Sequence, residues 1–233
     1  MGYFPFFTDI TGKHGVIVGG GKVAARKIEK LLAFEPRLTV IAPDMEECIR
    51  VSEDRLRESN VQGQGCESVL RLVERAFRME DLDGADFVIA ATDDETLNGS
   101  ISEYCMARRI PVNVVDDKKK CSFYFPALVR EGPLTIGVST DGKSPAAASY
   151  VRKEIAGHLP AGLGMAIDLM GQIRPRVMEY VDRESDRKDI LEKMFLYCME
   201  REGNVTAMEL EERFLSSLSD HKAAGIRRKE VES

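Results

Sequence analysis

A chain of 233 residues with 43% hydrophobic and 31% charged residues has the composition of a folded globular protein, so extensive disorder is excluded. Its formal net charge of −6 argues against general nucleic-acid binding, which requires a basic surface. The apolar start at Tyr3–Phe7 is too short for a signal peptide, and no apolar stretch is long enough to span a bilayer. We therefore expect neither a nucleic-acid nor a membrane partner.

The five cysteines and three histidines are scattered along the chain, and no C-x-x-C pair occurs. An odd number of widely spaced cysteines is typical of reduced thiols rather than of disulfides or a thiolate metal site. We therefore expect a cytoplasmic location and predict no metal ligands.

Residues Tyr3–Ile10 are expected to form a short edge strand or an apolar lead-in. A strand, a glycine-rich turn and an amphipathic helix then follow one another within Val16–Leu32. The spacing Gly19-x-Gly21-x-x-Ala24 fits the dinucleotide-binding fingerprint. The first glycine permits a tight turn, the second lets the backbone approach a pyrophosphate, and the alanine keeps the helix close to the sheet. The first amides of the helix would then face the phosphates, although a purely structural turn is the alternative.

A second strand is predicted at Arg37–Ile41, where Pro43 ends it. Asp44 lies where an acidic residue would bind a ribose hydroxyl, or it caps a helix predicted at Met45–Glu58. Ala42, directly at the end of the strand, carries no acid. The preference for NAD over NADP is therefore left open.

Three further strands with connecting helical segments complete the first half of the pattern. The continuous apolar run Phe87–Ala91 is typical of a strand buried on both faces of a parallel sheet. Thr92 and Asp93 follow it at the carboxyl edge, where open α/β sheets bind ligands. The alternation predicts a Rossmann-like doubly wound parallel sheet up to about residue 115. Its other expected elements are the strands Val69–Val73 and Pro111–Val115, a helical turn at Glu80–Asp83, and the helix Glu95–Arg109.

The pattern changes after residue 115. Two β-like runs, Phe123–Arg130 and Leu134–Thr140, have no helix between them and should pair antiparallel, packed on another subunit or on the next helices. Ser144 suits the N-cap of the following helix, and Pro145 its first position. The predicted domains are 1–115, a β segment 116–145, and a helical domain 146–233. The predicted helices are Ala146–Leu159, Leu163–Val181, Lys188–Glu202 and Ala207–Leu215.

Four blocks of this sequence together resemble one family. They are VIVGGGKVAARK, IAATDDETLN, VNVVDDKKKCSFYFPALVREGPLTIGVST and GKSPAAASYVRKEI, and they cover roughly two thirds of the chain. They resemble the precorrin-2 dehydrogenase/sirohydrochlorin ferrochelatase family of siroheme synthesis, and the stand-alone enzymes rather than the large fused siroheme synthase. The resemblance implies a homodimer in which NAD⁺ oxidises precorrin-2 to sirohydrochlorin, and in some members Fe²⁺ is then inserted.

The family's functional aspartate falls on Asp116, in the segment N-V-x-D. A carboxylate after a strand end could take the proton that accompanies hydride loss, whereas a simple turn residue is the alternative reading. The family's modified serine falls on Thr140, which is a departure. Combined with the glycine turn and the polar edge, the resemblance predicts cofactor binding by Gly19, Gly20, Gly21, Lys22, Val23, Pro43, Asp44, Thr92 and Asp93.

The substrate of this family is a polycarboxylate, so local positive charge must oppose the acidic balance of the chain. Lysines and an arginine gather in the expected cleft loops and the following helix, where a helix N-terminus adds amide donors. The alternative is that these charges only solvate a surface loop. A second hypothesis for the whole chain is a nucleotide-sensing module without catalysis. The predicted substrate-binding residues are Lys118, Lys119, Lys120, Lys143, Ser144 and Arg152.

Overall fold

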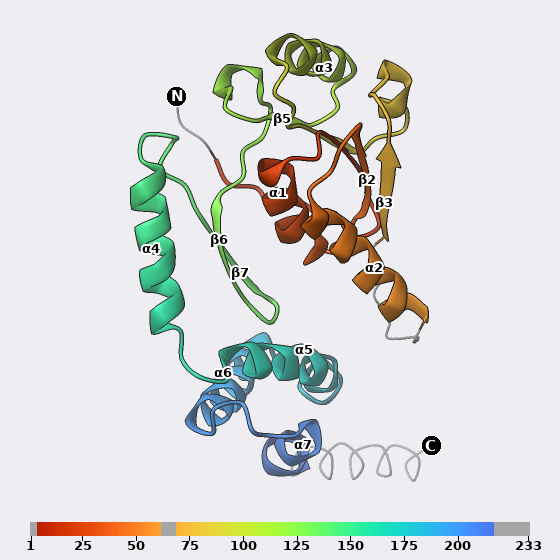
Figure 1. Ribbon diagram of the computed structural model, residues 1–233. Coiled ribbons are helices and arrows are strands. Elements are labelled where there is room, and N and C mark those ends of the chain that lie inside the picture. Colours follow the sequence, from red (N-terminus) through yellow and green to blue (C-terminus); the bar gives the residue numbers. More distant parts are fainter. Residues whose placement is uncertain (1–3, 62–68, 217–233) are drawn as a thin grey trace, which may run out of the picture. The chain divides into compact units, whose positions relative to one another are not determined.

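The computed structural model describes residues 4–61 and 69–216, which divide into two compact units, one ending at Phe125 and the other beginning at Pro126 (Figure 1). The first unit is an α/β sheet and the second is a β-hairpin with helices. No helix in the described ranges is long and apolar enough to cross a bilayer.

The first unit contains five parallel strands in the order β3-β2-β1-β4-β5. The chain builds outward from β1 in one direction and then returns to add β4 on its other side. This reversal makes the carboxyl ends of β1 and β4 the topological switch point, the place where doubly wound sheets bind ligands. The predicted sheet is confirmed. The strands are β1 (His14–Val18), β2 (Arg37–Ala42), β3 (Val69–Glu74), β4 (Phe87–Ala90) and β5 (Val112–Val114).

The side chains of successive residues in each strand point to opposite faces of the sheet, because side chains alternate along an extended backbone. Ile17 and Ile89 pack with α1 (Lys22–Leu32) and α2 (Glu47–Val61) on one face. Their neighbours Val16 and Val88 pack with α3 (Glu95–Arg108) on the other. All four side chains are fully buried, which explains the apolar runs in β1 and β4.

Short elements join the strands on either side of α3. A 3₁₀ turn, η1 (Met79–Leu82), precedes β4, and a second, η2 (Lys118–Lys120), follows β5. The N-terminal residues 4–10 form no strand, so the lead-in interpretation holds for them. Phe4, Phe6 and Phe7 there are largely exposed.

The second unit begins with an antiparallel hairpin of β6 (Ala127–Glu131) and β7 (Leu134–Val138), as predicted. The helix α4 (Pro145–His158) packs along both strands. Three further helices enclose an apolar core around Ile173 and Met194. The middle one of these three, predicted at Lys188–Glu202, begins four residues earlier, at Glu184. The three are α5 (Leu163–Tyr180), α6 (Glu184–Glu200) and α7 (Ala207–Phe214).

Candidate functional site

The glycine turn lies between the ends of β2 and β4. Gly19 has φ +114°, and its amide donates to the carbonyl of Ile41 at 2.9 Å. A Cβ added there would lie 2.2 Å from the carbonyl oxygen of Ala91, so only glycine fits. A Cβ on Gly20 would lie 2.4 Å from the carbonyl oxygen of Asp44. Both glycines therefore hold the turn against neighbouring strand ends.

Gly21 differs from its two neighbours because an added Cβ would meet nothing within 4 Å. It is the N-cap of α1, and no side chain caps the first turn of that helix. Lys22 and Val23 in this turn are exposed, whereas Ala24 is fully buried against the sheet, as the fingerprint predicts. The open space beside the first amides of α1 fits a pyrophosphate, which helix N-termini attract through these amides and the helix dipole.

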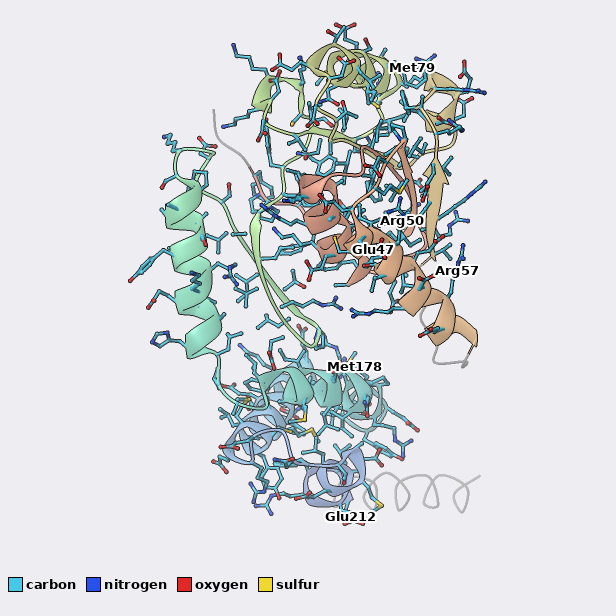
Figure 2. All side chains as sticks on the ribbon, viewed as in Figure 1. Glu47, Arg50, Arg57, Met79, Met178 and Glu212 are labelled. Atoms are coloured by element: carbon cyan, nitrogen blue, oxygen red, sulfur yellow. The ribbon has the colours of Figure 1, made fainter. Side chains whose placement is uncertain are left out.

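The end of β2 carries a network of charges around Arg50, which projects from α2 beside Glu47 (Figure 2). Its Nε donates to Glu74 Oε1 at 3.0 Å, and its guanidinium lies 3.6 Å from Glu47 and 3.9 Å from Asp44. Asp44 and Pro43 are exposed. Because α2 begins only at Glu47, Asp44 is not its N-cap, and the ribose interpretation is left for this side chain.

The end of β4 is a rigid polar turn. The Thr92 hydroxyl donates to Asn98 Oδ1 at 2.8 Å, and Asn98 Nδ2 donates to the Thr92 carbonyl at the same distance. Asp94 caps α3 by accepting from the amides of Thr96 and Leu97. Asn98 is 5% exposed, and it fixes the turn that passes under Gly19. Asn98 lies within the block IAATDDETLN, but no spacing in that block predicts its bonds to Thr92.

The end of β5 carries two adjacent aspartates in different environments. Asp116 is exposed and has φ +59°, and in the described ranges its carboxylate makes no hydrogen bond or ion pair. Asp117 caps η2 through the amide of Lys119 and forms an ion pair with Lys120 at 3.2 Å. The hydrogen bond from Lys120 holds the pKa of Asp117 below its usual value. Asp116 is thus the carboxylate left accessible.

The structure places the predicted lysines at β5 in unequal settings. Lys120 is engaged by Asp117 and lies over Gly99 of α3. Lys118 lies 5.7 Å from the ring centre of Tyr124, and Lys119 is exposed. Their role toward a substrate stays a prediction.

The remaining predicted residues belong to the second unit. Ser144 caps α4 through the amide of Ala147 at 3.1 Å, as expected. The Thr140 hydroxyl donates to the Ser144 carbonyl at 2.9 Å, so this residue closes the loop before α4. Lys143 is exposed and Arg152 is half-buried. Their role toward a substrate also stays a prediction.

Comparisons with known proteins agree with this geometry. Residues 6–127, more than half of the chain, match the family described as "Putative NAD(P)-binding", and residues 131–158 match "Sirohaem biosynthesis protein central". The chain belongs to this NAD(P)-binding family of siroheme biosynthesis proteins. The resemblance noted in the sequence is therefore confirmed. The Gly19–Gly21 turn, with its open space beside Gly21, lies inside the NAD(P)-binding match.

Curated relatives and a solved structure extend the match over most of the chain. Siroheme synthase 1 of Serratia proteamaculans is 34% identical over 195 residues, which are 84% of this chain and 38% of that protein. Siroheme synthase of Pseudomonas aeruginosa is 34% identical over 229 residues, which are 97% of this chain and 45% of that protein. The chain thus spans less than half the length of these relatives. The structure named "SirC, precorrin-2 dehydrogenase" has a TM-score of 0.63 at 20% identity, covers 94% of this chain and 100% of its own, and shows the same fold.

Proposed function

We propose that this chain oxidises precorrin-2 to sirohydrochlorin with NAD⁺, and that Asp116 is the catalytic base. The observation that carries the proposal is the accessible carboxylate after β5, at the same edge of the sheet as the glycine turn. The carboxyl ends of parallel strands share one edge, so a nucleotide bound at Gly21 would extend along it. The names of the siroheme synthases and of the SirC structure support this substrate.

The reaction removes two electrons and two hydrogens from the macrocycle. When bound, NAD⁺ supplies the acceptor for the hydride. The second hydrogen leaves as a proton, and the Asp116 carboxylate accepts it and later releases it to water. Asp116 has a left-handed backbone, and in the described ranges no capping bond or ion pair engages its exposed carboxylate. We thus assign nucleotide binding to the turn after β1 and proton transfer to the end of β5.

We infer NAD rather than NADP from the charges beside Asp44. A 2′-phosphate needs an available cation, and Arg50 is the cation that forms an ion pair with Asp44 in the part of the chain that the structure describes. Glu74 and Glu47 already engage it, and hydrogen bonding to Glu74 raises the pKa of Arg50. Since Asp44 adds further negative charge, a 2′-phosphate would be repelled here. The double variant Asp44→Asn/Glu74→Gln should narrow the preference for NAD⁺ over NADP⁺ by about tenfold, measured as a ratio of kcat/KM values.

The direct test supplies precorrin-2 and NAD⁺ to the full chain and follows NADH absorbance. The matched variant is Asp116→Asn, because asparagine tolerates the left-handed backbone while it cannot accept the proton. We expect oxidation to fall by at least about a hundredfold while NAD⁺ affinity, measured by calorimetry, stays within about twofold. Near-normal turnover in Asp116→Asn would remove the proposed base. Binding of NAD⁺ by the wild type without any turnover would instead favour the sensor hypothesis.

The substrate carboxylates are proposed to meet Lys118, Lys119, Lys120, Lys143, Arg152 and the amides that follow Ser144. Fe²⁺ insertion by the same chain stays a prediction, to be measured with sirohydrochlorin as the acceptor. Two further predictions are homodimerisation, which the resemblance implies, and a cytoplasmic location, which the cysteine pattern favours.

A further inference from the structure

Lys27 is a lysine on the buried side of α1. It lies one turn after Ala24 and one turn before Leu31, both of which are buried against the sheet. Its side chain is half-buried, and its ammonium donates to Asn113 Oδ1 at 2.8 Å. The same Nζ lies 4.0 Å from the ring centre of Phe125. A cation is therefore held between a buried amide and an aromatic face.

The two partners of Lys27 lie on either side of the segment that carries Asp116. Asn113 belongs to β5, three residues before it, and is 6% exposed. Its Nδ2 donates to the Phe123 carbonyl at 3.0 Å, which draws the two ends of the segment together. Phe125 follows directly after that closure. Lys27 therefore contacts both ends of one loop, 114–124.

Further hydrogen bonds close the same loop from within. The amide of Ser122 donates to the Val112 carbonyl at 2.8 Å. The amide of Val114 donates to Cys121 Sγ at 3.1 Å, and this thiol donates to the carbonyl of Asp117. These bonds lie within the loop and its strand. The amide of Val115 also donates to the Ala90 carbonyl of β4 at 2.9 Å, and the Ser102 hydroxyl of α3 donates to the Lys120 carbonyl at 2.7 Å. The Lys27 side chain is the polar link, among the described residues, that runs from α1 to Asn113.

We propose that Lys27 is a positioning residue, which fixes the Asp116 loop relative to the helix that begins at the nucleotide turn. This inference rests on the proposed function. Hydride and proton leave the same macrocycle, so the base and the bound nucleotide must hold a constant separation. Small displacements of a reacting group cost large factors in rate. Lys27 lies six residues after Gly21, on the helix that Gly21 caps. Its side chain contacts Asn113 and Phe125, at the two ends of the loop that carries Asp116.

The energetics of this lysine support a functional reason for it. Burial lowers the pKa of Lys27 to about 8, and the charge of Lys30 acts in the same direction. Cys121 and Asp116 oppose the shift. A methionine could fill the same space without a desolvated charge, so packing alone does not explain a lysine at this position.

The test compares Lys27→Met with Lys27→Arg, and uses Arg26→Met as a matched control for loss of an exposed charge on the same helix. Turnover of precorrin-2, NAD⁺ affinity and hydrogen exchange of the segment 115–125 are measured on the full chain. We expect Lys27→Met to lower kcat by about tenfold or more while NAD⁺ affinity stays within about twofold, and to speed exchange in 115–125. Lys27→Arg, which keeps the cation and its donors, should restore kcat to within about threefold.

The outcomes separate this inference from the proposed function. If the wild type oxidises no precorrin-2, the proposed function fails, and the exchange of 115–125 alone decides whether Lys27 holds the loop. Unchanged kcat in Lys27→Met, unchanged exchange in 115–125, or a parallel loss of kcat and NAD⁺ affinity would each overturn the inference. Should Lys27→Met not fold, Lys27→Leu replaces it, because leucine also removes the ammonium that donates to Asn113 and is a strong helix former.

Discussion

Replacing Lys27 by methionine should change how the stability of this protein depends on pH. An ordinary lysine has a pKa of 10.5, and burial lowers that of Lys27 to about 8. Below pH 8 both folded and unfolded chains carry the proton, and the folded state bears the full cost of the buried charge. Between pH 8 and 10.5 the folded chain loses its proton first, so wild-type stability rises with pH.

The size of this effect follows from the two pKa values. Their full difference corresponds to about 3 kcal/mol, an upper limit because Lys27 is only half-buried. Over the accessible range from pH 8 to 9.5, we expect the wild type to gain about 1 kcal/mol relative to Lys27→Met. At lower pH, where Lys27 is charged in both states, the lost bond to Asn113 lowers the stability of the variant by about 1 kcal/mol, whereas the slope with pH depends only on the two pKa values.

Urea denaturation followed by circular dichroism measures the difference between wild type and Lys27→Met at each pH. Cys121 also titrates near this lysine, so both proteins are compared in a Cys121→Ser background, where the hydroxyl can keep the bond from Val114. A stability difference that stays constant from pH 8 to 9.5 would refute the burial of a charged lysine, and with it the energetic argument for function.

Three other perturbations test the site and its supports. Gly19→Ala should destabilise the fold by more than about 2 kcal/mol, because the new Cβ would clash with the Ala91 carbonyl and because φ at this position is +114°. Gly21→Asp should leave the melting temperature nearly unchanged and should abolish NAD⁺ binding measured by calorimetry. If both variants lowered the melting temperature equally, the geometry assigned to the two glycines would be contradicted. Asn98→Ala removes the hydrogen bonds that fix the Thr92 turn, and should lower the free energy of unfolding by about 1–3 kcal/mol. It should also raise KM for NAD⁺ more than it lowers kcat. An unchanged KM would show that this turn does not contribute to nucleotide binding. Ser144→Ala removes the N-cap of α4 and should lower the free energy of unfolding, measured by urea denaturation, by about 1 kcal/mol. An unchanged free energy of unfolding would show that this cap does not stabilise the helix.

The fold was predictable from this sequence because its local signals agree. The apolar run at Val16–Val18 and the continuous run at Phe87–Ala90 can only be buried on two faces, which requires helices on both sides of the sheet. The turn Gly132-Pro133 between two β-like runs leaves no room for a crossover helix, so these strands pair antiparallel. Local pattern and global topology point to one answer here.

The supports of the site were harder to predict. A lysine such as Lys27 is expected at the solvent face of a helix, although its spacing from Ala24 and Leu31 places it on the buried side of α1. Lysine is almost never buried without a partner, and its partner Asn113 is 86 residues away in the sequence. No periodicity in one segment can reveal such a contact. Arg50 and Glu74, which come together at the end of β2, are the same kind of case.

The two aspartates after β5 show where local chemistry ends and tertiary structure decides. In the sequence they are neighbours of one type, and either could be a base or a turn residue. The lysines that follow separate them, because η2 needs an N-cap and Lys120 needs a counter-ion, and both fall to Asp117. Because the Asp117 carboxylate is paired with Lys120, the accessible carboxylate at this strand end is that of Asp116. The lysine run, for which a solvated surface is the alternative interpretation, thus pairs with Asp117 through Lys120 and leaves Asp116, the proposed base, accessible.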